Sequence, residues 1–126
     1  MTEAAGRKRY DLDERTFEFA ERVISFVRTL PRDPATTEIT RQVVRSSGSV
    51  GANYVEASES LGRKDFLMRA RICRKEAKET AYWLRLLKGI RPQSEAQRCS
   101  LIQEATEITR IFGAIVSCGE ARDAAP

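Results

Sequence analysis

The sequence contains no histidine among its 126 residues. Histidine is the usual general base at neutral pH, the commonest metal ligand and the usual activator of serine and cysteine nucleophiles. Its absence excludes the Glu-x-x-His motif with which di-iron helical bundles bind metal. The chain also lacks a Walker-type glycine loop and a dinucleotide-binding fingerprint. We therefore predict that the protein is not an enzyme and that it binds no metal ion and no cofactor.

Long apolar runs and cysteines are also scarce. No apolar run approaches the roughly 18 residues that a membrane span needs. The basic cluster at residues 7–9 is not followed by the apolar segment of a secretory signal. Cys73, Cys99 and Cys118 are odd in number and fit neither a disulfide framework nor a zinc site, so we expect reduced thiols, with Cys73 and Cys118 buried. We expect a cytoplasmic protein with no membrane partner.

Apolar residues recur at helical spacing in four segments, and no segment alternates as a half-buried strand does. The predicted helices span about residues 13–30, 36–61, 63–88 and 94–119. Thr36 or Thr37 is expected to cap the second helix, and Ser94 with Gln97 forms a capping box for the fourth. Short connections between amphipathic helices favour an antiparallel up-down four-helix bundle. We predict an all-α fold with a lead-in at 1–10, the bundle at 11–119 and a tail at 120–126.

One stretch of the second helix is rich in small residues. Residues 46–53 read Ser-Ser-Gly-Ser-Val-Gly-Ala-Asn, and a glycine inside a helix costs about 1 kcal/mol. The apolar period continues through the stretch without a phase shift, so we predict that it is helical and lets a neighbouring backbone approach closely. For the core, we predict that Phe66, Leu84, Ile108 and Phe112 are buried.

The third predicted helix has a basic flank. The window from Leu61 to Pro92 holds ten basic and three acidic residues, a net charge of +7, whereas the rest of the chain sums to −3. Placed at about 100° per residue, eight cations share one side: Arg63, Lys64, Arg71, Arg74, Lys75, Lys78, Arg85 and Lys88. We call them the basic face and predict that they bind nucleic-acid phosphates without reading sequence. Plain solvation and salt bridges between subunits remain alternative explanations.

The same helix has apolar residues away from its core stripe, namely Met68, Ile72, Trp83 and Leu86. A helix in a bundle normally buries one stripe and solvates the rest. A second apolar side therefore predicts a subunit interface in a homo-oligomer. A broad core with a few apolar surface residues is the alternative.

Two segments carry a family resemblance. Residues 42–57 read Gln-Val-Val-Arg-Ser-Ser-Gly-Ser-Val-Gly-Ala-Asn-Tyr-Val-Glu-Ala, and residues 75–84 read Lys-Glu-Ala-Lys-Glu-Thr-Ala-Tyr-Trp-Leu. Together with Lys64-Asp65-Phe66 they resemble the bacterial 23S rRNA intervening-sequence protein family. The most specific combination is Ser49, Asn53 and Glu56 followed by Asp65-Phe66. The resemblance covers roughly residues 17–87, and the fourth helix matches only in character.

The resemblance implies an antiparallel four-helix bundle assembled as a homopentameric ring, with residues 46–53 helical. Some members of the family are encoded within insertions in large-subunit rRNA genes. A related branch comprises the accessory proteins of diversity-generating retroelements, basic pentameric barrels that bind nucleic acid and the reverse transcriptase. The family has no known catalytic residues, so none can be carried over. The net charge of +4 is lower than in that strongly basic branch.

These observations together lead us to expect a noncatalytic oligomeric protein that binds RNA or DNA through the basic face. The alternative is a protein–protein assembly or scaffolding factor with no nucleic-acid ligand. Binding that weakens steeply with salt would distinguish the first from the second.

Overall fold

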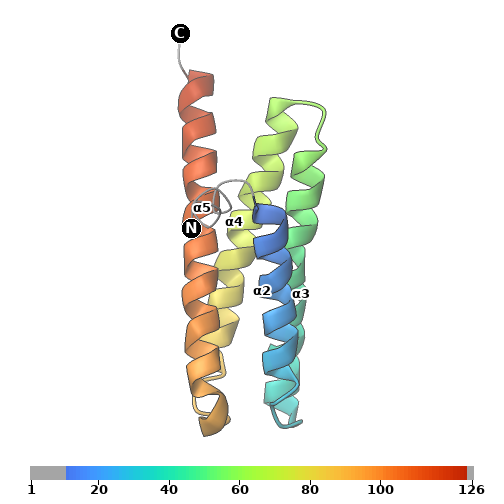
Figure 1. The fold of residues 1–126 in the computed structure, drawn as a ribbon, viewed down its shortest axis with the longest axis vertical. Helices are drawn as coiled ribbons and strands as arrows, with labels where there is room; N and C mark the ends of the chain where they lie inside the picture. Colours follow the sequence, from blue (N-terminus) through green and yellow to red (C-terminus); the bar gives the residue numbers. More distant parts are fainter. Residues whose placement is uncertain (1–10, 125–126) are drawn as a thin grey trace.

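The computed structural model describes residues 11–124, and every regular element within that range is helical (Figure 1). The four α-helices are α2 (Leu12–Val27), α3 (Pro34–Ser58), α4 (Arg63–Leu86) and α5 (Glu95–Ala124), with the short 3-10 helix η1 (Pro92–Ser94) before α5. The predicted all-α fold with four helices is therefore confirmed. None of the helices in the described range is long and apolar enough to cross a membrane. The predicted lead-in at residues 1–10 lies outside the described residues.

The helices pack against their neighbours in the chain. Helix α3 packs extensively on α4, α4 on α5, and α2 on α3, whereas α2 and α5 share a smaller contact. In Figure 1, α2 begins near mid-height, so the upper parts of α3, α4 and α5 extend beyond it. Helices that are neighbours in the chain, α2 with α3, α3 with α4 and α4 with α5, therefore each meet along a seam.

The core consists of the inward stripes of all four helices. Leu84, Ile108 and Phe112 are fully buried, as predicted, and the ring of Phe112 meets the ring of Tyr54 edge to face at 5.7 Å. The prediction for Phe66 is wrong, because this ring is only half-buried and the next residue, Leu67, lies in the core instead. Near its start, α4 is therefore rotated so that Leu67, rather than Phe66, faces the core.

Glycine at position 119 explains that rotation. A Cβ at Gly119 would collide with Cδ2 of Leu67, so the absence of a side chain on α5 makes the space that Leu67 fills. Gly119 also does not end the helix, contrary to expectation: α5 continues to Ala124. Its backbone φ is not positive, whereas the glycine of the α4–α5 turn, Gly89, has φ of 76° and forms the left-handed stop that a helix end favours.

The small-residue stretch 46–53 is helical throughout, as predicted. A Cβ on Gly51 would lie 3.2 Å from Oγ1 of Thr16, so α2 and α3 approach closely at this point. The start of α3 differs from expectation, because neither Thr36 nor Thr37 is the cap. Asp33 is the N-cap, its side chain accepts the backbone N–H of Thr36 at 2.9 Å, and Pro34 occupies the first turn, where proline loses no helical hydrogen bond.

Candidate nucleic-acid interface

Within the basic face, four cations lie beside α5, namely Arg63, Arg71, Arg74 and Lys78. Two of the eight cations form ion pairs with α5: Arg63 Nε donates to Asp123 Oδ1 at 2.6 Å, and Arg71 Nη2 donates to Glu120 Oε2 at 2.8 Å. Their positive charges are therefore already compensated within the chain. Lys88 follows Leu86, the last residue of α4, so it belongs to the turn rather than to the helix.

Six cations of the basic face have no ion pair within residues 11–124: Lys64, Arg74, Lys75, Lys78, Arg85 and Lys88. Five of the six are exposed, and Arg74 is half-buried. A surface with this much uncompensated charge of one sign attracts polyanions over distances of about 8–10 Å at physiological salt. The prediction that these residues bind nucleic acid remains a prediction, but the structure presents them to solvent as such binding requires.

Two of these cations, Arg74 and Lys78, line a hollow between α4 and α5 together with a cation that sequence reasoning missed, Arg110. The hollow has a volume of about 560 Å³. Its lining residues, which define the α4–α5 hollow, are Arg74, Lys78, Ala81, Thr106, Thr109 and Arg110. The sequence carries no signal for Arg110, because its position depends on which side of α5 faces α4.

Two carboxylates of α5, those of Glu104 and Glu107, bind an arginine of α2. Arg15 of α2 donates through Nε and Nη2 to the two carboxylate oxygens of Glu104 at 2.8 Å, and through Nη2 to Glu107 at 2.9 Å. Hydrogen bonding and attraction, first of all from Glu104, raise the pKa of Arg15 above its usual range, so the guanidinium is fully charged. Neither carboxylate lines the α4–α5 hollow, to which α5 contributes Thr106, Thr109 and Arg110.

The predicted oligomer interface is partly outward and partly inward. Met68 and Leu86 are 42% and 46% exposed, Ile72 is half-buried, and Trp83 is half-buried because it packs on the core. The ring of Trp83 also meets Tyr82 edge to face at 5.1 Å. Met68 and Leu86 therefore offer apolar surface to a partner, whereas Trp83 contributes to the fold of its own chain.

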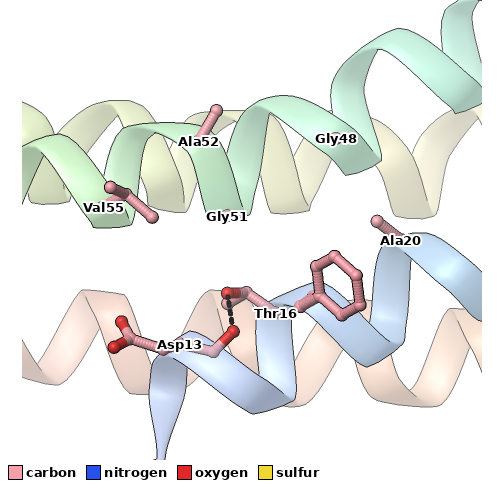
Figure 2. A pocket seen from close by; sticks show the side chains of 8 residues that line it. Asp13, Thr16, Ala20, Gly48, Gly51, Ala52 and Val55 are labelled. Atoms are coloured by element: carbon pink, nitrogen blue, oxygen red, sulfur yellow. Dashed lines mark hydrogen bonds between the residues drawn. The ribbon is translucent and has the colours of Figure 1, made fainter.

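A second apolar surface follows the seam between α2 and α3, where sequence reasoning predicted none. Phe17 and Val55 are 58% and 49% exposed, and they flank a groove of about 250 Å³ (Figure 2). The groove, which we call the α2–α3 groove, is lined by Asp13, Thr16, Phe17, Ala20, Gly48, Gly51, Ala52 and Val55. The available signal was Phe17 itself, a large aromatic residue outside the core stripe that Phe19, Val23 and Phe26 share.

The cysteines offer no metal site. Cys73 is buried, its Sγ donates weakly to the carbonyl of Val50 at 3.4 Å, and burial raises the pKa of its thiol to about 12. Cys118 is exposed, contrary to expectation, and Cys99 is exposed as well. No group of cysteine, aspartate and glutamate side chains in residues 11–124 could hold a metal ion.

These features define a class, that of small all-helical proteins built from four long α-helices with a basic surface. The family model "23S rRNA-intervening sequence protein" matches residues 8–114, and the chain belongs to that family. The match confirms the resemblance seen in the sequence and extends it through most of the fourth helix.

A solved crystal structure from Bacteroides thetaiotaomicron has a similar fold. It is described as a protein with unknown function from the S23 ribosomal protein family, and it is 32% identical to the present chain with a TM-score of 0.69. The alignment covers 82% of this chain and 96% of the Bacteroides chain. No curated protein matches the sequence.

Proposed function

We propose that the protein is a noncatalytic, cytoplasmic nucleic-acid-binding protein that acts through the basic face of α4. The observation that carries this proposal is the set of six cations without an ion pair in residues 11–124. Some other exposed arginines do form ion pairs, for example Arg45 with Glu76 and Glu79 at 3.4 and 3.5 Å. A row of unpaired cations along one helix suits the repeating phosphates of a nucleic-acid strand.

We expect the protein to bind nucleic acids with little preference for their sequence. Tyr82 is the one aromatic residue on the outer side of α4, at 53% exposure, so base stacking has little surface to use. Phosphate contacts position a nucleic acid without identifying its bases. We expect dissociation constants of about 10⁻⁴–10⁻⁶ M at physiological salt for one subunit.

Assembly would strengthen such binding, and we propose an antiparallel up-down bundle that forms a homopentamer. The up-down order is supported by Figure 1, where successive connections lie at alternate ends of the helices. Self-association is supported by the exposed apolar side chains of Met68 and Leu86. Several copies of the basic face on one particle would raise avidity above the affinity of a single face.

The test uses three cations of α4 that do not line the α4–α5 hollow. Lys64→Glu, Lys75→Glu and Arg85→Glu are combined in one variant, and binding of fluorescently labelled single-stranded RNA and DNA is followed by anisotropy at low and at physiological salt. We expect affinity to fall by more than about tenfold. The control reverses three exposed cations of the α2–α3 region, Arg28, Arg32 and Arg41. Equal losses in the two variants would show a nonspecific charge effect and contradict the proposed face.

A protein partner is the second candidate, and the α2–α3 groove favours it. Phe17 and Val55 expose apolar surface that nucleic acid does not need. If the parent protein binds neither RNA nor DNA at low salt, the assembly or scaffolding function becomes the better explanation.

A further inference from the structure

We infer that the α4–α5 hollow is a binding site for a phosphate group, held by Arg74 and Lys78 of α4 and by Arg110 of α5. Three cations from two helices converge on one hollow of about 560 Å³, within the range of about 300–1,000 Å³ that is usual for ligand sites. We infer the phosphate site from this geometry alone. The further step, that a nucleic-acid backbone supplies the phosphate, rests on the proposed function.

The packing of α4 against α5 builds the hollow. Position 113 of α5 is glycine, and a Cβ there would meet Cδ of Arg74 at 3.8 Å, so the stem of Arg74 lies along α5. Ala81 leaves space below the charged groups because its side chain is a single methyl. Thr106 and Thr109 donate their hydroxyl hydrogens to the carbonyls of Ile102 and Ala105 at 2.8 and 2.7 Å, so both hydroxyl groups already have a hydrogen-bond partner. No acidic residue lines the hollow that could compete with an anion for the cations.

Arginines that reach a neighbouring helix meet more than one kind of partner, and Arg22 and Arg69 donate there to the neutral side chains of Ser100 and Asn53. Four other arginines that reach across to a neighbouring helix meet a carboxylate there: Arg15, Arg45, Arg63 and Arg71. Arg74, Lys78 and Arg110 have no such partner within residues 11–124. Like charges that share a hollow repel one another, and the repulsion is largest where the walls exclude water. A bound anion removes this cost, so the arrangement favours an anionic ligand.

The chemistry of the three side chains selects a tetrahedral oxyanion. Each guanidinium presents parallel N–H donors that match two oxygens of one phosphate, and a lysine adds a compact positive charge. The same recognition serves a terminal phosphate of a small molecule and a phosphodiester of a nucleic-acid strand. The ligand class is therefore the phosphate group, and the two sources are separated by experiment.

Inorganic phosphate tests the site directly. The uniformly ¹⁵N-labelled parent protein is titrated with phosphate against chloride of equal ionic strength, and amide shifts are followed by NMR. We expect saturable shifts in α4 and α5 around Ala81 and Thr109. These shifts should vanish in Arg74→Gln/Arg110→Gln and persist in the control Arg32→Gln/Arg41→Gln, whose cations are exposed on the α2–α3 side. Arg74→Lys/Arg110→Lys should retain a weakened response, which separates lost charge from lost fold.

Two results would overturn the inference. One is the absence of saturable shifts around the hollow in the parent protein. The other is a response that persists unchanged in Arg74→Gln/Arg110→Gln, because the site would then lie elsewhere.

An oligonucleotide arm identifies the source of the phosphate. With single-stranded RNA or DNA, Arg74→Gln/Arg110→Gln should weaken binding about tenfold. It should also reduce the slope of log K against log salt by about 1.4, since each phosphate contact on a single strand contributes about 0.7.

If phosphate binds in the hollow and no oligonucleotide binds the parent, the site stands with a small phosphate ligand and the proposed function fails. If oligonucleotide binding depends on Lys64, Lys75 and Arg85 and phosphate finds no site in the hollow, the function stands and this inference fails.

Discussion

The α2–α3 and α4–α5 seams differ in the kind of surface that they expose. Between α2 and α3, glycine and alanine bring the backbones together and leave a shallow apolar groove beside Phe17 and Val55. Between α4 and α5, the hollow is more than twice as large, at about 560 against about 250 Å³, and three cations line it. The same architecture therefore offers one surface that suits apolar groups and one that suits anions.

The two seams also differ in the side chains that line them. Glu104 and Glu107 of α5 pair with Arg15 of α2, and no carboxylate lines the α4–α5 hollow. The α2–α3 seam instead depends on shape, since a Cβ at Gly51 would lie 3.2 Å from Oγ1 of Thr16, which is tighter than most contacts of a Cβ. Binding at the apolar groove should tolerate salt, whereas binding at the hollow should weaken with it.

The largest expected effect comes from breaking the core that both seams share. Phe112→Ala removes a fully buried ring and its edge contact with Tyr54, so the free energy of unfolding should fall by about 3–5 kcal/mol. The matched control is Phe17→Ala, which removes the same ring from an exposed position and should cost less than about 1 kcal/mol. Urea unfolding at fixed protein concentration measures both. Equal losses in the two variants would mean that Phe17 is covered in the assembled protein.

The next largest effect concerns the ion pairs that Arg15 forms with Glu104 and Glu107 between α2 and α5. Arg15→Ala removes two hydrogen bonds to Glu104 and one to Glu107, all partly buried, and should cost about 1–3 kcal/mol. The control Arg41→Ala breaks a 3.8 Å pair with Glu38 that is well exposed, so it should change stability by less than about 0.5 kcal/mol. Unfolding in urea compares the pair. If Arg15→Ala is as mild as the control, the carboxylates are held in place by something other than Arg15.

A pair of glycines tests the shape of the apolar seam. Gly48→Ala should raise the free energy of unfolding by about 0.5–1 kcal/mol, because alanine is the better helix former and a Cβ at this position meets nothing within 4 Å. Gly51→Ala should gain less or lose stability, because its Cβ lies 3.2 Å from Thr16 Oγ1. Thermal melts of the two variants give the difference. A larger gain at position 51 than at position 48 would show that α2 moves away from α3 without cost.

The sequence predicted local features well. Apolar spacing is a property of one helix, so four helices, the helical stretch 46–53 and the buried side chains of Leu84, Ile108 and Phe112 could all be predicted from it. Seven of the eight cations of the basic face lie on α4, so their grouping is also a property of one helix, whereas Lys88 lies in the turn after it. Asp33 was missed as the N-cap of α3. Asp followed by Pro34 is a helix-start signal, but Thr36 and Thr37 are also favourable capping residues and were chosen instead.

Features that depend on two helices at once could not be predicted. Whether Phe66 or Leu67 enters the core is decided by the space above Gly119 on another helix. Arg110 shares a hollow with Arg74 only because α4 and α5 pack with these sides toward each other. The spacing of residues along a single helix predicts neither feature, because the rotation of one helix against another is set by side chains from both.

The smallest expected effect concerns the stability of Arg110→Gln. Arg110 is exposed and has no ion pair in residues 11–124, and it shares the hollow with Arg74 and Lys78. Removing one of three like charges should relieve repulsion and raise the free energy of unfolding by up to about 0.5 kcal/mol at low salt. In about 1 M salt the Debye length is only about 3 Å, so the gain should disappear. Urea unfolding at the two salt concentrations measures it, and Arg32→Gln, an exposed arginine outside the hollow, is the control. A loss of more than about 1 kcal/mol would show that Arg110 stabilises the fold, and its positive charge would then need no anion to explain it.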